Sequence, residues 1–556
     1  MTDPTTITGG EIVAHSLVAN GIDTLFGIPG VQLDPVFAGL HDVSDKLRVI
    51  HARHEQGLAL MAFGYAHASR KTGVLLVVPG PGFLNATTGL LVAHACNTPM
   101  LCLAGQSERM FIGSGVGVLH ELDNQIGIAE SLAKWCQRVE DVSQIGPLLA
   151  QALEQAHLGR TRPVYLELPS DIVRMSMRED SPVLASHEPA SPELDEDAID
   201  ALAQRLAKSR FPLIIAGGGS THAGDSIQAL AEMLGAGVGM SENGMGTIDC
   251  SHPLAFNQLG SNKLWAHADT VLALGTRLYA PIYNWGWDDG MHISKVDIDI
   301  GELNRLPAPI NGVHGEVGQV VNALLDRVPR YLDKPVVLDA HFDSARQAVA
   351  DAMAPQHVSA SILQGIRQEI GEEGIVVVDV TQINHACLEL LPVHHPRTYV
   401  SSGYQGALGF GPCTALGMKV AKPETPVVCL TGDGGFMYAA QELATAVQFD
   451  VPVIMVIINN NAYKNVEGIL NNAYGGRAIA TSLVNPDFCR FAESFGVEAR
   501  RVTSSSQMQT ALRELLARNA PGVIDFRLDE LESPFWLRFL PQVRKQVPAN
   551  EFGLVK

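Results

Sequence analysis

The stretch PVVCLTGDGG, residues 426–435, ends an apolar run in a glycine-rich turn that carries one acid, Asp433. A helical pattern follows, and then PVIMVIINNNAY, residues 452–463, ends a second apolar run in three asparagines. Two apolar runs separated by one helix are typical of strands in a parallel sheet. Loops at the carboxyl ends of neighbouring parallel strands open into one crevice, so we expect Asp433 and Asn460 to face each other there.

The residue types at these two strand ends suggest a ligand site. A carboxylate, an amide oxygen and a backbone carbonyl are the hard oxygen donors that Mg²⁺ or Ca²⁺ takes. Gly432, Gly434 and Gly435 would let backbone N–H groups close on a phosphate carried by that metal. Either turn alone is ordinary loop chemistry. Both together, on successive strand ends, favour a metal and phosphate site.

Apolar strand-like runs alternate with helical patterns along nearly the whole chain, which indicates an α/β protein built on parallel sheets. We expect three doubly wound domains, at 1–175, at 195–330 with a dinucleotide-fold-like pattern, and at 355–535. A C-terminal tail, 536–556, is expected to lie over the surface. Polar, proline-containing stretches at 178–197 and 330–347 are expected to connect the domains.

The composition narrows the classes of partner. Of the 556 residues, 46% are hydrophobic and 18% charged, and the formal net charge is -20. An acidic surface disfavours nucleic acid and anionic membranes. No apolar run reaches the roughly 18 residues of a membrane span, and the N-terminal sequence lacks a signal-peptide pattern, so a cytoplasmic protein is expected. The eight cysteines show no CxxC spacing and are expected to be reduced thiols.

The GDG turn followed at this distance by NN resembles the cofactor-binding motif of the thiamine diphosphate (ThDP) enzymes. In that family the motif's Asp, its second Asn and a carbonyl two residues later hold the metal that anchors the diphosphate. The resemblance therefore implies ThDP with Mg²⁺, or Ca²⁺, held by Asp433, Asn460 and the carbonyl of Ala462. Tyr463 and the glycines of the GDGG turn would line the same cofactor site.

ThDP enzymes also need a glutamate, from a separate pyrimidine-binding domain, that activates the cofactor through its aminopyrimidine ring. The segment IHARHEQG resembles the RHEQ segment of acetolactate synthases and places that glutamate at Glu55. The alternative is that Glu55 only complements a helix N-terminus. Two nearby loops, LFGIPG and PGPGFLN, also match the family and imply cofactor contacts from Ile28, Pro29, Gly82 and Asn85.

Further loops of the third domain match the same family. GYQGALGFG contains Gly406 and places Leu408 where the family has the bulky residue that bends ThDP, a position usually held by Met in acetolactate synthases. DVTQINH places Thr381 and Gln382 among the cofactor contacts. The resemblance covers essentially the whole chain, with the domain order pyrimidine-binding, central and diphosphate-binding. It implies a homodimer or homotetramer whose sites are shared between subunits.

The resemblance is strongest to acetolactate synthases, which decarboxylate one 2-oxo acid and join the product to a second. Two departures concern the substrate. Past the asparagines, Lys464, Glu467 and Ile469 replace the residues that select the acceptor in that group. The family's active-site Gln is His120 here, and Gln32 stands where benzaldehyde lyase has an active-site His. His120 could exchange protons near neutral pH, although a lone His is more often structural.

Several activities therefore stay open. The first is an acetolactate synthase-like decarboxylase and carboligase; the second is a ThDP lyase or simple decarboxylase acting on a 2-hydroxy ketone, an acyl-CoA or another 2-oxo acid. A flavin-dependent pyruvate oxidase type is third, and a scaffold without chemistry is the alternative from another class. The glycines of IIAGGGST, Gly217–Gly219, are weak evidence for FAD, so FAD is disfavoured, while an adenine nucleotide or an empty central domain stays open.

Overall fold

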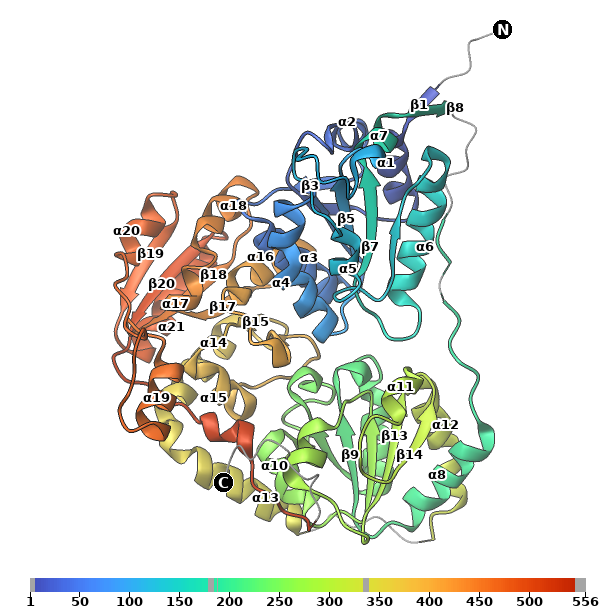
Figure 1. The fold of residues 1–556 in the computed structure, drawn as a ribbon. Coiled ribbons are helices and arrows are strands. Elements are labelled where there is room, and N and C mark those ends of the chain that lie inside the picture. The colour runs from blue at the N-terminus through green and yellow to red at the C-terminus, as the bar shows by residue number, and fades with distance from the viewer. Residues whose placement is uncertain (1–5, 179–184, 188, 334–339, 546–556) are drawn as a thin grey trace.

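The computed structural model describes residues 6–178, 185–187, 189–333 and 340–545. Three six-stranded parallel sheets organise these residues into an N-terminal, a central and a C-terminal unit (Figure 1). The three doubly wound α/β units that the alternating sequence predicts are therefore confirmed. Within the described ranges, no helix is both long enough and apolar enough to cross a bilayer.

The N-terminal unit has the strand order β3-β2-β4-β5-β7-β6. Its strands are β2 (Thr24–Gly27), β3 (Arg48–Ile50), β4 (Gly73–Val77), β5 (Met100–Gln106), β6 (Cys136–Arg138) and β7 (Val164–Pro169). Its helices are α1 (Gly9–Ala19), α2 (Asp34–Asp42), α3 (Glu55–Ser69), α4 (Pro81–Ala95), α5 (Gln125–Ala129), α6 (Ile145–His157) and α7 (Ser170–Arg174). Beside the sheet, β1 (Thr6–Thr8) pairs antiparallel with β8 (Ser176–Arg178).

The central unit has the order β11-β10-β9-β12-β13-β14. Its strands are β9 (Pro212–Ala216), β10 (Gly237–Met240), β11 (Ala255–Phe256), β12 (Thr270–Leu274), β13 (His292–Asp297) and β14 (Ile310–His314). Its helices are α8 (Glu196–Lys208), α9 (Gly224–Leu234), α10 (Gln258–Trp265), α11 (Ile300–Leu303) and α12 (Val317–Arg327). Counted within the unit, the order is 3-2-1-4-5-6, that of dinucleotide-binding folds.

The C-terminal unit has the order β16-β15-β17-β18-β20-β19. Its strands are β15 (Ile375–Val378), β16 (Tyr399–Val400), β17 (Val427–Gly432), β18 (Ile454–Asn459), β19 (Glu498–Val502) and β20 (Gly522–Arg527). Its helices are α14 (His357–Ile370), α15 (Gln382–Leu390), α16 (Phe410–Ala421), α17 (Asp433–Phe436), α18 (Leu443–Gln448), α19 (Lys464–Ala473), α20 (Phe488–Glu493) and α21 (Ser505–Ala517). β15, β17 and β18 are buried on both faces, as a sheet covered by helices on each side requires.

The N-terminal and C-terminal sheets have the same topology. Counted within its own unit, each reads 2-1-3-4-6-5. All strands run parallel, but the order in which they are added to the sheet reverses between the first and third strands, β2 and β4 in one sheet and β15 and β17 in the other. Ligands of open α/β sheets bind at such reversals, outside the carboxyl ends of the strands. The fold thus offers two equivalent ligand-binding edges in one chain.

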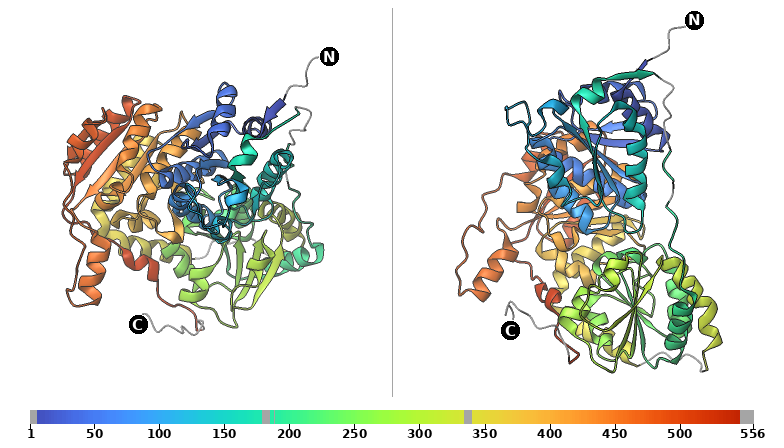
Figure 2. Two further views of the ribbon diagram at one scale, coloured as in Figure 1. Left: turned by 45° about the horizontal axis from the view of Figure 1, so that its top comes forward. Right: turned by 45° about the vertical axis from the view of Figure 1, so that its right-hand side comes forward.

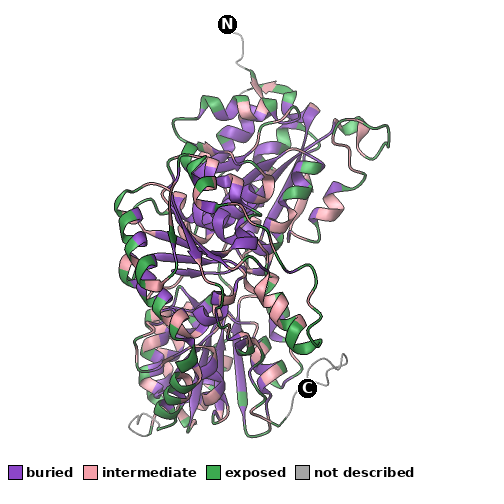
Figure 3. Cartoon of the chain, turned by 90° about the vertical axis from the view of Figure 1, so that its left-hand side faces the viewer, coloured by how far each residue is buried: buried purple, intermediate pink, exposed green. Residues whose placement is uncertain are grey.

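Helices α3 and α16 join these two units directly. A Cβ at Gly64 would stand 2.2 Å from the Thr414 carbonyl oxygen, and one at Gly417 would stand 1.9 Å from that of Met61. Such a close approach leaves no room for a side chain at either glycine. One buried apolar cluster runs through both units, whereas the central unit has its own core, and Figure 3 shows the buried interior that results.

The structure corrects several expected element boundaries. The end of the stretch 330–347, expected as a connection, begins helix α13 (His341–Met353), which packs on the central core through Phe342 and Ala345, and residues 334–339 of the stretch lie outside the described residues. The C-terminal segment does not simply lie over the surface, because Leu537 and Leu540 are buried in that same core. Residues 546–556 of the expected tail, and 179–184 and 188 of the first connection, lie outside the described residues.

The helix expected at 437–449 is shorter than its sequence pattern suggests. A 3₁₀ turn at Ala440–Glu442 leads into the brief α18. The edge strands β6 and β19 were not expected, because CQR and EARRV are too polar to signal a buried strand. Edge strands need only one neighbour, so their sequences carry a weaker pattern.

Candidate active site

The first half of the candidate site lies at the carboxyl end of β17, where the GDGG turn enters α17. Asp433 is 2% exposed there. One carboxylate oxygen accepts a hydrogen bond from the Gly434 N–H at 2.9 Å, and the other accepts one from Asn485 Nδ2 at 2.7 Å. Burial raises the pKa of Asp433, and no cationic side chain among the described residues offsets that effect. A buried carboxylate without a cationic partner is costly, so this position suits a bound cation.

The three asparagines after β18 have three different environments. Asn459 ends the strand and donates from Nδ2 to the buried Asp525 at 2.7 Å. Asn460 donates from Nδ2 to Gln382 Oε1 at 3.0 Å, and within the described ranges no hydrogen bond reaches its amide oxygen. Asn461 adopts a left-handed conformation, with φ of 55°, which asparagine tolerates better than most residues. Among the described residues, the amide oxygens of Asn459 and Asn460 therefore both lack a hydrogen-bond partner, and that of Asn459 is buried.

Two contacts close the asparagine turn onto the GDGG turn. Asn485 donates from Nδ2 both to Asp433 and, at 3.2 Å, to Asn461 Oδ1. The Tyr463 ring lies so near Gly434 that a Cβ there would stand 2.4 Å from the ring. Gly434 is therefore required by close approach and not by a turn alone. The strand-end neighbours predicted from the sequence do lie together.

Ala462 presents a backbone oxygen in the same place. It forms an isolated antiparallel bridge with Ser482, in which the Tyr463 N–H donates to the Thr481 carbonyl at 2.8 Å. This bridge holds the backbone of the turn in one conformation. In the part of the chain that the structure describes, the Ala462 carbonyl oxygen accepts no hydrogen bond.

The ends of β15 and β17 also meet. Thr381 precedes α15 and is 8% exposed, and a Cβ at Gly432 would stand 3.6 Å from its hydroxyl oxygen. Gln382 begins α15 and bonds to the Leu531 carbonyl at 2.9 Å as well as to Asn460. Thr381 and Gln382 therefore border the GDGG and asparagine turns.

The loop before α16 lies against the GDGG turn. Gly406 in this loop has a φ of 56°, and Leu408 is partly buried. A Cβ at Gly409, next to Leu408, would stand 3.5 Å from the Gly435 carbonyl oxygen. The loop therefore reaches the edge that carries Asp433.

The second half of the site lies at the equivalent edge of the N-terminal sheet. Glu55 begins α3 after β3, and Asn85 Nδ2 donates to its carboxylate at 3.0 Å. A Cβ at Gly82 would stand 3.4 Å from the other Glu55 oxygen. Ile28 and Pro29 follow β2, the strand between β3 and β4. All five lie at the carboxyl ends of three adjacent strands.

Gln32 and His120 lie in adjoining segments of this unit. Gln32, 6% exposed, donates from Nε2 to the Leu119 carbonyl at 3.2 Å, and its Oε1 is buried without a partner in the described ranges. His120 has a φ of 64°, and its Nδ1 is likewise buried without a described partner. Buried polar atoms are almost always paired, so two such atoms here fit a site that another group completes.

Three further residues support these edges. Gln125 is buried and accepts a hydrogen bond from the Gly80 N–H at 2.8 Å, at the turn against which the His120 carbonyl rests. Asp379, at the end of β15, accepts one from the Thr431 hydroxyl, and burial raises its pKa to about 6. The third of these supporting residues is Asn485, which donates a hydrogen bond to Asp433. An acid at a strand end, as in VVVDV, could have indicated Asp379; Gln125 and Asn485 carry no sequence signal.

The two halves of the candidate site belong to different units of the chain. Where these units meet, the Glu442 carboxylate accepts a hydrogen bond from the Arg53 N–H and would be 3.0 Å from a Cβ at Gly57. Arg53 and Gly57 flank Glu55, so the start of α3 lies at the contact with the C-terminal unit.

Known protein families match all three units. The N-terminal binding, central and C-terminal binding domains of the thiamine pyrophosphate enzymes match residues 7–128, 199–324 and 379–526. The chain belongs to the thiamine pyrophosphate (ThDP) enzyme family. Both ligand-binding edges of this ThDP enzyme fall within the two domains that the family uses to bind its cofactor.

Individual relatives narrow the class. A probable 2-ketoarginine decarboxylase of Pseudomonas aeruginosa is 31% identical over 94% of this chain and 94% of its own length. A probable acetolactate synthase large subunit of Methanococcus aeolicus is 30% identical, over 94% of this chain and 92% of its own. The acetolactate synthase isozyme 1 large subunit of Escherichia coli is 27% identical, over 95% of both. This ThDP enzyme is therefore an acetolactate synthase-like carboligase or decarboxylase.

The donor set at the C-terminal edge fits a metal-bound diphosphate. Asp433 brings a buried carboxylate without a cationic partner, and Asn460 and Ala462 bring two oxygens that no described donor occupies. Mg²⁺ prefers such hard oxygen ligands and binds through few protein groups plus phosphate oxygens. These residues of the ThDP enzyme could therefore hold the metal and the diphosphate together.

Proposed function

We propose that this chain is a ThDP- and Mg²⁺-dependent enzyme that breaks or forms a carbon–carbon bond of a 2-oxo acid, by decarboxylation and carboligation of the acetolactate synthase type. The observation that carries the proposal is the buried, cation-free carboxylate of Asp433 beside the open oxygens of Asn460 and Ala462. Bound ThDP supplies a nucleophilic carbon and an electron sink for the bond next to the substrate carbonyl.

The domains and residues have distinct parts in this proposal. Residues 1–175 bind the pyrimidine ring, 355–535 bind the diphosphate, 195–330 form the central domain, and 536–556 form the tail. Three groups of this chain act on the cofactor or the substrate. Glu55 would exchange a proton with the aminopyrimidine ring of bound ThDP, Leu408 would pack against the cofactor, and His120 with Gln32 would face the substrate. The metal ligands are Asp433, Asn460 and the Ala462 carbonyl.

The remaining proposed contacts line the cofactor pocket from both domains. From the N-terminal domain they are Ile28, Pro29, Gly82 and Asn85; from the C-terminal domain they are Thr381, Gln382, Gly406, Gly432, Gly434, Gly435 and Tyr463. Most sit in turns where backbone N–H groups can approach an anion or a flat ring closely.

Decarboxylation without carboligation is the second candidate. One relative carries the name of a 2-ketoarginine decarboxylase. On α19, Lys464 Nζ pairs with Glu467 Oε2 at 2.6 Å. Two opposite charges therefore stand at positions that select the acceptor substrate in acetolactate synthases. No residue of α19 is buried, and the helix lies at the periphery of the C-terminal unit (Figures 1 and 2). A charged, exposed helix fits a substrate other than two pyruvates.

A substrate panel separates the two candidates. The enzyme with ThDP and Mg²⁺ would be given pyruvate, branched and aromatic 2-oxo acids, 2-ketoarginine, benzoin and an acyl-CoA. CO₂ release and carboligation product would be measured for each. CO₂ with a stoichiometric 2-hydroxy ketone supports the carboligase, and CO₂ with aldehyde supports the decarboxylase. Cleavage of benzoin or the acyl-CoA alone would replace both with a lyase.

We further propose a cytoplasmic homodimer or homotetramer in which Glu55 of one subunit completes the site of Asp433 in another. The placement of the two edges on different sheets of the chain supports this arrangement. The unpaired, buried polar atoms of Gln32 and His120 on the N-terminal edge support it as well.

A mixing experiment tests the shared site. Glu55→Gln and Asp433→Ala chains, each inactive alone, would be co-expressed with different tags, and the mixed oligomer purified through both. In a two-chain oligomer with shared sites, one of the two sites regains both intact residues, so about half of the wild-type activity should return. An inactive mixed oligomer would show that each site lies within one chain. That result would leave the ThDP chemistry itself in place.

A further inference from the structure

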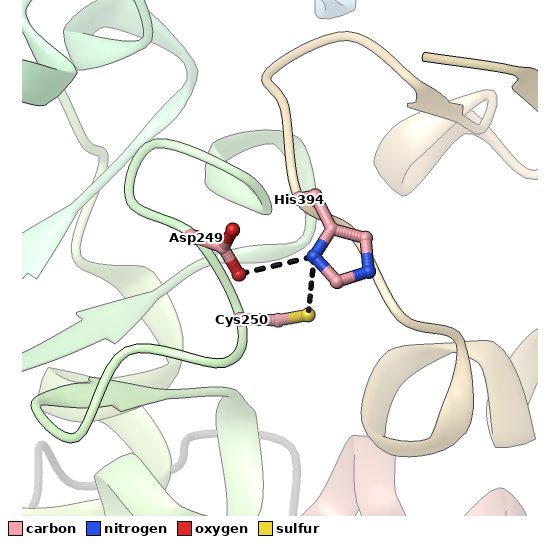
Figure 4. A group of neighbouring side chains, drawn as sticks. All are labelled: Asp249, Cys250 and His394. Carbon is pink, nitrogen blue, oxygen red and sulfur yellow. Dashed lines mark hydrogen bonds and ion pairs between the residues drawn. The ribbon is translucent and has the colours of Figure 1, made fainter. Parts of the chain in front are cut away.

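A cluster of three potential metal ligands includes none of the residues of the candidate active site. Asp249 and Cys250 belong to a loop of the central unit, and His394 belongs to the loop between α15 and β16 of the C-terminal unit (Figure 4). The two loops touch directly, because the Cys250 N–H donates to the Val393 carbonyl at 3.3 Å. The three side chains are each partly buried, so solvent can reach the cluster.

The geometry of the cluster is that of a convergent site. His394 Nδ1 lies 3.1 Å from Asp249 Oδ1 and 3.8 Å from Cys250 Sγ. A catalytic relay would place the acid and the thiol on opposite ring nitrogens. Here both face the same nitrogen, so the arrangement does not suit a nucleophilic cysteine. All three ligand atoms lie within 4.8 Å of one another.

These separations match those around one tetrahedral ion. With Zn–N near 2.0–2.1 Å and Zn–S near 2.3 Å, tetrahedral angles place N and S about 3.5 Å apart, and N and O about 3.3 Å apart. The observed separations of 3.8 and 3.1 Å differ from these by a few tenths of an ångström. Small side-chain movements would therefore complete the coordination.

We propose that Asp249, Cys250 and His394 bind one Zn²⁺ ion, with water as the fourth ligand. A thiolate, an imidazole and a carboxylate form a zinc-type ligand set, whereas Mg²⁺ and Ca²⁺ take oxygen ligands alone. Ser251 orients the carboxylate, since its N–H and its hydroxyl each donate to Asp249 Oδ1 at 2.7 Å. The site is thus chemically distinct from the oxygen-only set around Asp433.

The bound ion would join two domains. Asp249 and Cys250 belong to the central unit, while His394 belongs to the C-terminal unit. A Cβ at Gly246 would stand 2.4 Å from the His395 carbonyl oxygen, so the loops already pack closely. Bound zinc would stabilise this contact and thereby fix the orientation of the central unit relative to the N-terminal and C-terminal units.

Metal analysis of the full-length protein tests the site. The wild-type enzyme would be stripped with a chelator, dialysed against Zn²⁺ or Co²⁺ in the presence of ThDP and Mg²⁺, and its metal content measured. We expect one zinc per chain. In the cobalt form we expect the absorption bands of tetrahedral Co²⁺ with a thiolate-to-cobalt charge-transfer band. Zn²⁺ should also raise the melting temperature by about 2–5 °C.

Matched variants separate this site from adventitious binding. Cys250→Ser and His394→Gln should lose the zinc, the charge-transfer band and the thermal shift. The controls Cys489→Ser, another partly buried free cysteine, and His395→Gln, the neighbouring histidine, should keep all three. Circular dichroism would check that each variant is folded. Zinc retained in folded Cys250→Ser, or no zinc bound by the wild type, would overturn the proposal.

Discussion

The N-terminal and C-terminal sheets share one strand order, but their ligand-binding edges differ in completeness. At the C-terminal edge, Asp433 is buried, and Asn485 joins it to the asparagine turn. At the N-terminal edge, Glu55 is only partly buried, and its described side-chain hydrogen bond comes from the exposed Asn85. At the C-terminal edge, residues of the same unit hold Asp433 in place. At the N-terminal edge, the Glu55 side chain stays partly exposed to solvent.

The residue directly after the first strand of each sheet shows the same contrast. Asp379 follows β15 and is fully buried behind the GDGG turn, whereas Ile28 stands at the corresponding place after β2. One topology therefore carries a buried acid directly after the first strand of one sheet and an apolar side chain at the equivalent position of the other. The difference teaches that the fold decides where ligands bind, and side chains decide which.

The largest effect should come from Asp433→Ala. Removing the buried carboxylate takes away the charged metal ligand, so Mg²⁺-dependent ThDP affinity should fall by about 100-fold or more. Calorimetry with and without Mg²⁺ measures this. Asp529→Ala, an exposed acid of the same unit, is the control. Unchanged ThDP affinity in Asp433→Ala would remove this residue from the metal site.

Glu55→Gln should separate binding from turnover. The amide keeps the shape and the contact with Asn85 but cannot exchange a proton, so turnover should fall by about 10²–10⁴-fold. ThDP affinity, set at the other edge, should change little. Steady-state kinetics and calorimetry on one preparation measure both quantities, with the exposed Glu130→Gln as control. Near-wild-type turnover would refute the proton-transfer role.

His120→Ala should have a smaller effect. The residue lies at the open edge with Nδ1 buried and without a described partner, so its loss should lower turnover by roughly 10-fold and alter the pH–rate profile. ThDP affinity should stay within experimental error. His41→Ala, on the surface, is the control. A pH–rate profile identical to that of the wild type would assign His120 a structural role.

Asp379→Asn should change how the stability of the protein depends on pH. Burial raises the pKa of Asp379 from 3.8 to about 6, so the folded protein keeps the proton where the unfolded chain has lost it. Its contribution to stability therefore falls as pH rises from about 4 to about 6, by up to about 3 kcal/mol. The melting temperature of Asp379→Asn relative to wild type should rise across that window in the cofactor-free enzyme.

Asp42→Asn, an exposed acid, is the control for this measurement and should show no such trend. Any constant cost of placing an amide among the backbone donors shifts the whole curve and leaves its slope intact. A difference between Asp379→Asn and wild type that does not vary between pH 4 and 6 would contradict the prediction.

The asparagine run after β18 is only partly predictable from the sequence. The apolar run before it predicts a strand, and β18 is observed there. The position after that strand predicts a ligand-facing turn, which stays a prediction. The sequence cannot show, however, that the three identical asparagine side chains lie in different environments. Asp525 binds Asn459 and Gln382 binds Asn460, and both partners come from segments far along the chain. Only the folded structure distinguishes them.

The sequence by itself determined the three sheets and the strand ends that carry Asp433, Asn460 and Glu55. These follow from apolar periodicity and from turn residues, which act over a few neighbouring positions. Only the folded chain shows that Asn485 joins Asp433, that helices α3 and α16 pack in contact, and that Cys250 lies next to His394. Such contacts depend on how whole domains pack, and no local pattern of residues records that packing.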